Sequence, residues 1–172
     1  WLALTLSNNT SFKAYLEIFI QLIKPRWRAD RTYSKVQEIR QESADMYSLI
    51  IRPGRQWRGF KAGQFVELTV QKDGAWLSRF FSISSSPSYF YATGLIELSI
   101  QIQADGLITP WLPKALKKGH SVNLSQAQGE FCLPNRQKPL LMIAGGSGIT
   151  PFRSMLQQLA LLRARQKNKA AA

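Results

Sequence analysis

Two stretches of the sequence decide which fold this chain predicts: Arg79-Phe80-Phe81-Ser82 and Gly145-Gly146-Ser147-Gly148-Ile149-Thr150-Pro151. The first places a cation, aromatic rings and a hydroxyl in a segment that alternates like a strand. Arg79 and Phe81 are two positions apart, so they point to one side of that strand. The second stretch is a glycine turn that joins an apolar run to a helical pattern. The chain therefore predicts a β region followed by the opening of an α/β unit.

The hydrophobic period is two on both sides of the first stretch, as expected of strands. The clearest case is 95–103, where isoleucines and leucines occupy one face and Glu97, Ser99, Gln101 and Gln103 the other, which predicts a strand with one face in the core and one toward water. Ser86-Pro87-Ser88 and two further short gaps carry turn residues. A short helix is expected over 109–118. Strands are expected at 35–41, 46–52, 64–71, 76–84, 95–103, 122–124 and 129–133.

Many short strands at close spacing predict a barrel or a sandwich. The run Leu140-Leu141-Met142-Ile143 is apolar throughout, which is typical of a strand buried on both faces, and we expect a strand over 139–144. A helix should follow, with Thr150 as its N-cap and Pro151 in its first turn. Because the chain ends soon after Arg165, the expected unit lacks a return strand, and its apolar faces should be partly uncovered.

The N-terminal part predicts an amphipathic helix, because apolar residues recur with helical spacing from Phe12 to Ile23 and Pro25 ends the pattern. Its apolar stripe packs on the following domain, or it contacts a membrane surface or a partner. It is too short to span a bilayer. A basic linker follows over 24–33. We expect three parts, 1–33, 34–136 and 137–172.

Charge and composition restrict the function classes. The 172 residues hold 23 Lys and Arg against 10 Asp and Glu, a net charge of +13, which favours acidic partners. Cys132 is the single cysteine and His120 the single histidine, so no disulfide framework and no metal ligand set is expected, and a reducing, cytoplasmic compartment fits, with or without contact to the inner face of the membrane. The sequence shows no arrangement of His or carboxylate residues typical of general acid–base catalysis.

The residue types around Ser82 suit a flavin nucleotide. A flavin needs an apolar platform for its ring, a hydrogen-bond partner near N5, and positive charge or amide N–H groups for its phosphates. Phe81, Ser82 and Arg79 are of these three types, and a guanidinium can hold phosphate oxygens in bidentate fashion. A core strand with one extended arginine is the alternative that these four residues alone leave open.

Further motifs carry a family resemblance over about Ser34–Leu162. Arg79–Ser82 resembles the R-x-Y-S motif of the ferredoxin–NADP reductase superfamily. The other matching motifs, in chain order, are Gly63-Gln64-Phe65-Val66, Gly106-Leu107-Ile108-Thr109, Gly129-Glu130-Phe131 and Gly145–Pro151. Residues 56–64 resemble the corresponding segment of reductases that serve oxygenases or desaturases.

The resemblance implies a six-stranded antiparallel Greek-key barrel that binds FAD, followed by the first strand–helix unit of a nucleotide-binding α/β domain. It implies that Arg79 contacts the flavin phosphates, that Phe81 stacks on the ring, that Ser82 bonds near N5, and that Gly106–Thr109 hold the pyrophosphate at a helix N-terminus. Phe81 and Ser82 are the candidate catalytic residues. The candidate cofactor-binding residues are Arg79, Phe80, Phe81, Ser82, Gln101, Ile102, Gly106, Leu107, Ile108, Thr109, Gly145, Gly146, Ser147, Gly148, Thr150 and Pro151.

The predicted function is therefore a flavin-dependent reductase: hydride from NAD(P)H to FAD, then single electrons to a ferredoxin-type iron–sulfur partner that serves an oxygenase or desaturase. A 2Fe–2S cluster would lie in that partner or in a missing part, and the fragment itself should not complete catalysis. Phe81 stands where the family has Tyr, which leaves FAD or FMN open. The alternative is a non-catalytic basic module that docks on membrane or nucleic acid. The choice between NADH and NADPH, the final acceptor and the oligomeric state stay open.

Overall fold

A computed structural model describes residues 31–134 and 139–170. The chain divides into two units, Trp1–Arg31 and Thr32–Ala172, and all described residues except Arg31 belong to the second. The predicted N-terminal helix lies outside the described residues.

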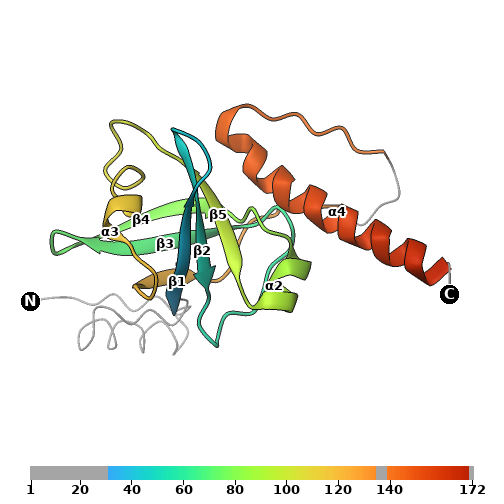
Figure 1. The fold of residues 1–172 in the computed structure, drawn as a ribbon, viewed down its shortest axis with the longest axis horizontal. Coiled ribbons are helices and arrows are strands. Elements are labelled where there is room, and N and C mark those ends of the chain that lie inside the picture. The colour runs from blue at the N-terminus through green and yellow to red at the C-terminus, as the bar shows by residue number, and fades with distance from the viewer. Residues whose placement is uncertain (1–30, 135–138, 171–172) are drawn as a thin grey trace, which may run out of the picture. The chain divides into compact units, whose positions relative to one another are not determined.

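Six strands form one sheet in the order β4-β3-β6-β1-β2-β5, and the sheet curls into an antiparallel half-barrel (Figure 1). The pairs β1–β2, β2–β5, β3–β4 and β3–β6 are antiparallel. Six of the seven strands predicted over 35–133 are confirmed, with ends that move by up to four residues. The strands are β1 (Arg31–Gln41), β2 (Met46–Arg52), β3 (Phe65–Lys72), β4 (Ala75–Ser82), β5 (Ile96–Gln101) and β6 (Ser121–Ser125).

The two outer strands, β4 and β5, come together without forming a regular ladder along their length. Instead, the segment that leaves β4 bonds to β5: the amide of Ser84 donates to the carbonyl of Glu97 at 2.8 Å. Next to this bond, at the last three residues of β4, an opening separates the two strands. This opening, called here the β4–β5 seam, faces the start of the C-terminal helix. The apolar face of β5, Ile96, Leu98 and Ile100, is buried as predicted.

The polar face of β5 departs from the prediction. Glu97 is only 7% exposed, although its place in the alternation predicted contact with water. The reason is tertiary, because the C-terminal helix α4 (Ile149–Ala170) covers this face of the strand and sets Arg153 against the carboxylate.

Helix α2 (Pro87–Thr93) replaces the turn predicted at Ser86-Pro87-Ser88. The same residues that favour a turn here begin a helix: Ser86 Oγ accepts a hydrogen bond from the amide of Tyr89 at 3.1 Å, and Pro87 occupies the first helical turn. Gly94 ends the helix with a φ of 70°. The helix α3 (Leu112–Ala115) lies within the predicted 109–118.

Residues 129–133 form no strand, contrary to the prediction. Gly129 has a φ of 104°, and its Cα is covered by the ring of Phe65, so this segment leaves the ladder after one isolated bridge between Phe65 and Gln128. The left-handed conformation at glycine turns the backbone away from β3.

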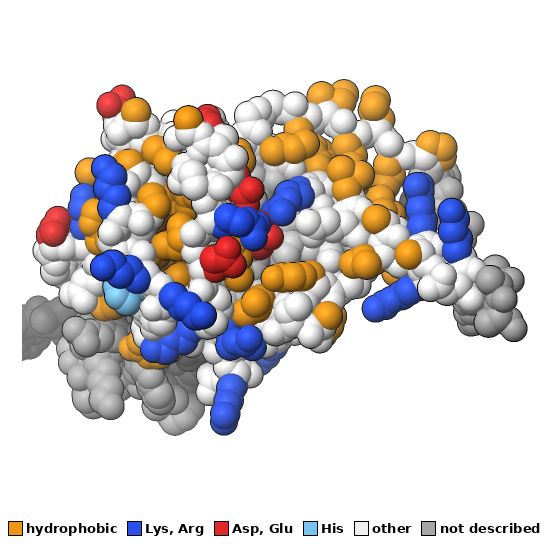
Figure 2. Space-filling model, in the orientation of Figure 1, with side chains coloured by type: hydrophobic (Ala, Val, Ile, Leu, Met, Phe, Trp, Pro, Cys, Tyr) orange, Lys and Arg blue, Asp and Glu red, His pale blue; other side chains and the backbone are white. Residues whose placement is uncertain are grey.

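The strand predicted over 139–144 is also wrong. This segment is irregular, with Leu141 87% and Ile143 80% exposed. A strand needs a neighbour for its backbone groups, and the part of the chain that the structure describes supplies none beside it. In Figure 2, hydrophobic side chains gather on the surface around this segment and α4.

The predicted C-terminal helix is confirmed as α4, preceded by the short 3-10 helix η1 (Gly146–Gly148). Pro151 is in the first turn, as expected. Thr150 is not the N-cap, because it lies inside the helix and its Oγ1 donates to the carbonyl of Ser147 at 2.8 Å. Among the described residues, no helix combines the length and the apolar character needed to cross a bilayer.

Candidate functional site

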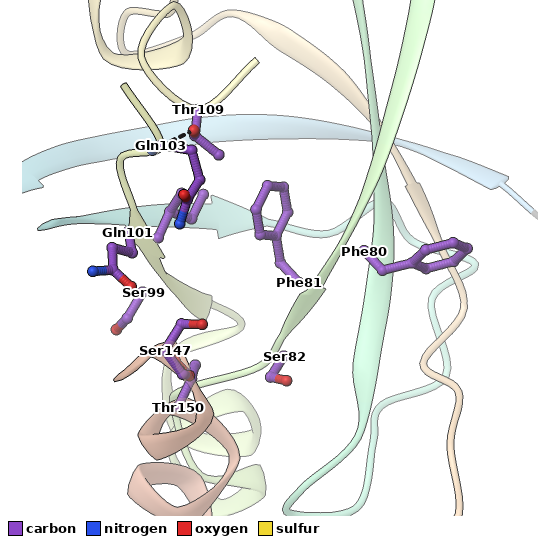
Figure 3. A pocket seen from close by; sticks show the side chains of 10 residues that line it. Phe80, Phe81, Ser82, Ser99, Gln101, Gln103, Thr109, Ser147 and Thr150 are labelled. Carbon is purple, nitrogen blue, oxygen red and sulfur yellow. Dashed lines mark hydrogen bonds between the residues drawn. The ribbon is translucent and has the colours of Figure 1, made fainter. Parts of the chain in front are cut away.

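A cavity of about 250 Å³ lies at the β4–β5 seam (Figure 3). Four segments that are distant in sequence meet there: the end of β4, the end of β5, the turn before α3 and the start of α4. Seven of its ten lining residues belong to the predicted site, and Ser99, Ile100 and Gln103 are additions. The full lining is Phe80, Phe81, Ser82, Ser99, Ile100, Gln101, Gln103, Thr109, Ser147 and Thr150.

Phe81 and Phe80 point to opposite sides of β4 (Figure 3). Phe81 pairs with the buried Val66 of β3 and packs against the hydrophobic core, so only part of its ring faces the cavity. Ser82, the last residue of β4, presents its hydroxyl at the cavity edge. The strand thus places an apolar surface and a hydroxyl next to each other, as the sequence predicted for these residue types.

Phe80 is 63% exposed and belongs mainly to a second, more open hollow of about 410 Å³. Phe65, Ser82 and Gln128 also line this hollow, and the rings of Phe65 and Phe80 meet edge to face with centroids 5.6 Å apart. The two hollows share Phe80 and Ser82. The smaller one gathers more hydroxyl and amide groups and has the chemistry expected of a nucleotide site. Sequence reasoning placed Phe65 in a motif but not in the site, and it missed Gln128.

Arg79 does not line either hollow. Its guanidinium is exposed, and Nη1 donates to the carbonyl of the neighbouring Ser78 at 2.7 Å. Its β3 partner is Leu68 and that of Phe81 is Val66, so the two side chains leave the same side of β4. Arg79 therefore leaves β4 on the same side as Phe81.

The turn at 106–109 is fixed from two directions. The amide of Gly106 donates to the carbonyl of Gln103 at 2.8 Å, and Thr109 Oγ1 accepts from the Gln103 amide at 2.9 Å. Tyr47 on β2 donates its buried hydroxyl to the carbonyl of Thr109 at 3.1 Å. No hydrogen bond from the amides of Leu107, Ile108 or Thr109 is found within residues 31–134 and 139–170. Three successive N–H groups are thus available at a rigid turn.

Gln101 and Ile102 are held by a residue that the sequence did not single out. Asp45, in the β1–β2 loop, accepts from Gln101 Nε2 at 3.4 Å, and its carbonyl accepts from the Ile102 amide at 2.7 Å. Hydrogen bonds from Ser43 and then Gln101 lower the pKa of Asp45 below its usual value. Gln101 lines the cavity and Ile102 does not.

The glycine turn brings two of its residues, Ser147 and Thr150, to the cavity. Gly146 has a φ of 52°, and the amide of Gly148 donates to the carbonyl of Gly145 at 3.0 Å. A Cβ added at Gly145 or Gly148 would meet no atom within 4 Å, so this turn is open to its surroundings. The predicted site residues that do not line the cavity are Arg79, Ile102, Gly106, Leu107, Ile108, Gly145, Gly146, Gly148 and Pro151.

Comparison with known families identifies both halves of this arrangement. Residues 32–132 match the oxidoreductase FAD-binding domain, and residues 142–170 match the oxidoreductase NAD-binding domain. This chain belongs to the ferredoxin–NADP reductase superfamily. The predicted resemblance is confirmed, and the seam cavity of this superfamily member lies where the two matched segments meet.

Curated relatives of this superfamily member are oxidoreductases and electron transfer components. An NADPH oxidoreductase of Mycobacterium tuberculosis is 31% identical over 82% of this chain and 38% of its own length. A toluate 1,2-dioxygenase electron transfer component of Pseudomonas putida is 32% identical over 73% of this chain and 36% of its own. The chain spans about a third of the length of the curated relatives it matches.

Solved structures show the same fold. The FAD/NAD-binding domain of nitric oxide dioxygenase from Vibrio cholerae is similar with a TM-score of 0.68 and 26% identity, over 77% of this chain and 58% of that one. A ferredoxin NADP⁺ reductase from Neisseria gonorrhoeae, with bound FAD and NADP, is similar with a TM-score of 0.65 and 27% identity, over 78% and 53%.

Proposed function

We propose that this chain binds FAD at the β4–β5 seam and brings NAD(P)H to it, as the flavin-binding part of an electron-transfer reductase. The supporting observation is the meeting of Phe81 and Ser82 with Ser147 and Thr150 in one cavity. The first two residues come from the segment that matches an FAD-binding domain, and the last two from the segment that matches an NAD-binding domain.

Phe81 and Ser82 are the proposed reaction-site residues. The half-buried ring of Phe81 gives a flat, rigid surface for stacking, and the hydroxyl of Ser82 can donate to a ring nitrogen beside it. FAD, when bound, accepts a hydride from NAD(P)H and passes electrons on singly. The chain's own task is placement, since acid–base groups are not needed for hydride transfer.

The phosphates are assigned to the turn at 106–109 and to Arg79. Amides of Leu107, Ile108 and Thr109 form a row of donors that have no acceptor among the described residues, and such rows bind anions. Arg79 has donors left beyond its bond to Ser78 and leaves β4 on the same side as Phe81. Two separate phosphate-binding groups favour the diphosphate of FAD over the single phosphate of FMN.

The glycine turn 145–151 is assigned to the pyridine nucleotide. Its exposed glycines allow a phosphate to approach the backbone, and α4 begins directly after it. We accordingly place the FAD-binding part, a Greek-key barrel closed by the bonds between Ser84 and Glu97, at 34–136 and the start of the nucleotide-binding part at 137–172, behind an N-terminal segment 1–33.

The proposed electron acceptor is a ferredoxin-type iron–sulfur domain or protein serving an oxygenase or desaturase. The similarity to an oxygenase electron transfer component and to a glycine betaine monooxygenase reductase subunit supports it. The net charge of +13 supports it too, because a basic protein attracts an acidic partner from a distance.

A titration with FAD tests the assignment. The chain should bind FAD with quenching of flavin fluorescence, and Phe81→Ala should weaken binding by about tenfold or more, because stacking on an aromatic side chain contributes about 1–3 kcal/mol. Tyr91→Ala is the control: it removes an exposed aromatic ring that lines neither hollow. A folded chain that binds no flavin would contradict the proposal.

The alternative, a basic module that docks on nucleic acid or an anionic membrane, rests on the net charge and on the apolar stripe predicted from Phe12 to Ile23. It predicts strongly salt-dependent binding to DNA or to anionic vesicles with no flavin in the preparation. A yellow preparation whose colour survives dialysis favours the flavin site.

A further inference from the structure

The first three turns of α4 are joined to the barrel by polar side chains. Ser154 is fully buried and its hydroxyl donates to the carbonyl of Ser85 at 2.6 Å. The side-chain oxygens of Gln157 and Gln158 accept from the amides of Ser86 and Ser88 at 3.0 and 3.1 Å. Because these three residues share one helix face, the helix has a defined rotation against the segment that follows β4.

Arg153 adds an ionic contact on the same side of the helix. Its Nη1 lies 2.9 Å from Glu97 Oε1, 3.1 Å from Ser84 Oγ and 3.2 Å from Ser99 Oγ. The Glu97 carboxylate is nearly buried and is shared with Arg40 of β1, whose Nη2 lies 3.0 Å from the same oxygen. A carboxylate in this position requires cationic partners, because burial without them would be costly.

The contact lies one helical turn beyond the wall of the cavity. Thr150, three residues before Arg153, lines the cavity, and its bond to Ser147 joins the glycine turn to the helix. On the other wall, Ser99 lines the cavity two residues after Glu97. The ion pair therefore connects the strand that forms one wall to the helix that carries the other.

We propose that Arg153 and Glu97 are positioning residues that set the gap between the glycine turn and the Phe81–Ser82 platform. This inference rests on the proposed function, since the gap is where the two nucleotides would meet. The serines and glutamines orient the helix, and the ion pair determines how closely its first turn approaches β5. Neither residue needs to touch a cofactor.

The variants Arg153→Met and Glu97→Gln test this. Arg153→Met keeps the volume of the stem and leaves Glu97 paired with Arg40, so the barrel should stay folded. Amide hydrogen exchange over 145–151 should then accelerate by about tenfold, the change expected when a charged hydrogen bond that restrains a segment is lost. Arg153→Lys, which keeps the charge, should restore part of the protection. Arg163→Met, an exposed arginine farther along α4, is the matched control and should change nothing.

The second measurement uses FAD as the probe. With the helix loosened, bound flavin should become more accessible to water, with a blurred visible absorption band and weaker fluorescence quenching, while the unfolding midpoint of the barrel, followed by its core Trp57, stays near that of the parent chain. If amide exchange and the flavin spectrum are unchanged in both variants, the positioning role is wrong. If exchange accelerates in the variants but neither they nor the parent chain bind FAD, the proposed function is wrong. The coupling of helix α4 to strand β5 is then still supported.

Discussion

The hydroxyl of Tyr47 donates to the carbonyl oxygen of Thr109 across 3.1 Å, and this bond ties the second strand of the barrel to the turn proposed to hold the flavin phosphates. Tyr47 is completely buried, and burial raises the pKa of its phenol above the ordinary value. The relationship links a residue of the core to the shape of the site, 62 positions away.

Tyr47→Phe should therefore weaken both folding and flavin binding. The ring stays, so the loss is that of one buried hydrogen bond, about 1 kcal/mol in the free energy of unfolding. Tyr47→Phe should raise the FAD dissociation constant more than a similarly destabilising core change such as Ile96→Val. Such a difference would show that the loss of the hydroxyl acts on FAD binding through the turn. Equal effects of the two changes would contradict this.

The same phenol predicts the alkaline behaviour. Because its folded pKa is raised, its contribution is fully present below the unfolded pKa of about 10 and is lost as the pH rises above it. The parent chain should lose stability between pH 9 and about 11 more steeply than Tyr47→Phe. Urea denaturation at several alkaline pH values measures the difference. If the free energy of unfolding falls equally with pH in the two proteins, Tyr47 does not determine the loss of stability in alkali.

Asp45 predicts an effect at the acid end. Its pKa is lowered, so its contribution is present above the ordinary pKa of about 3.9 and disappears as the pH falls through the lowered value. Asp45→Asn should lose less stability than the parent chain when the pH is taken from 6 to about 3. Since Asp45 is exposed, the effect should be small and should shrink in high salt. If Asp45→Asn loses as much stability as the parent chain over this pH range, Asp45 does not contribute to the loss of stability in acid.

Gly106→Ala tests the choice between FAD and FMN. A Cβ at this position would lie 2.9 Å from the Gln103 carbonyl oxygen, so the turn must shift and its three free amides with it. FAD binding should weaken by about tenfold, consistent with the loss of a charge-assisted contact to phosphate, while FMN binding changes little. Asp105→Ala, an exposed change in the same turn, is the control. Equal losses for FAD and FMN would place the second phosphate elsewhere.

Gly63→Ala should unfold the chain readily. Gly63 has a φ of 105°, and an added Cβ would overlap the carbonyl oxygen of Phe131 and come within 2.5 Å of Met155 Cε. Both the backbone conformation and the crowding oppose a side chain, so we expect a loss of about 2 kcal/mol or more. Gly74→Ala is matched in backbone, with a φ of 80°, but has open space around it and should cost clearly less. Thermal unfolding compares the two variants. Similar unfolding midpoints would show that the residues around Gly63 move to accommodate the added methyl group.

The exposed run at 140–143 predicts self-association. Leu141 and Ile143 are the most exposed large apolar side chains of the described residues, and they lie two positions apart in one apolar run with strand-like composition. Sedimentation should show association that grows with concentration, and the double change Leu141→Asp, Ile143→Asp should abolish it. Tyr91→Asp, an equally exposed aromatic position on α2, should leave it intact. A monomeric parent chain at all concentrations would contradict the prediction.

Local pattern alone was enough to predict much of this protein. The two-residue alternation located the strands, because side chains of one strand must alternate between core and surface. The order of the glycine and aromatic motifs indicated the superfamily and pointed to Phe81, Ser82, Thr109, Ser147 and Thr150, residues that the fold brings together. Ser86-Pro87-Ser88 shows the limit of such patterns, since the same residues begin a turn or cap a helix, and only the following residues and their packing choose between the two.

Contacts between distant segments decided the rest. Glu97 was expected at the surface and is buried, because α4 brings Arg153 to it from 56 positions away. The apolar run before α4 was expected to be a strand and is irregular, because a strand exists only beside another strand. Alternation and composition are properties of neighbours in sequence and can be seen in the chain itself. The gap at the β4–β5 seam and the partners of its polar groups depend on which segments meet in space, and only the folded structure determines that.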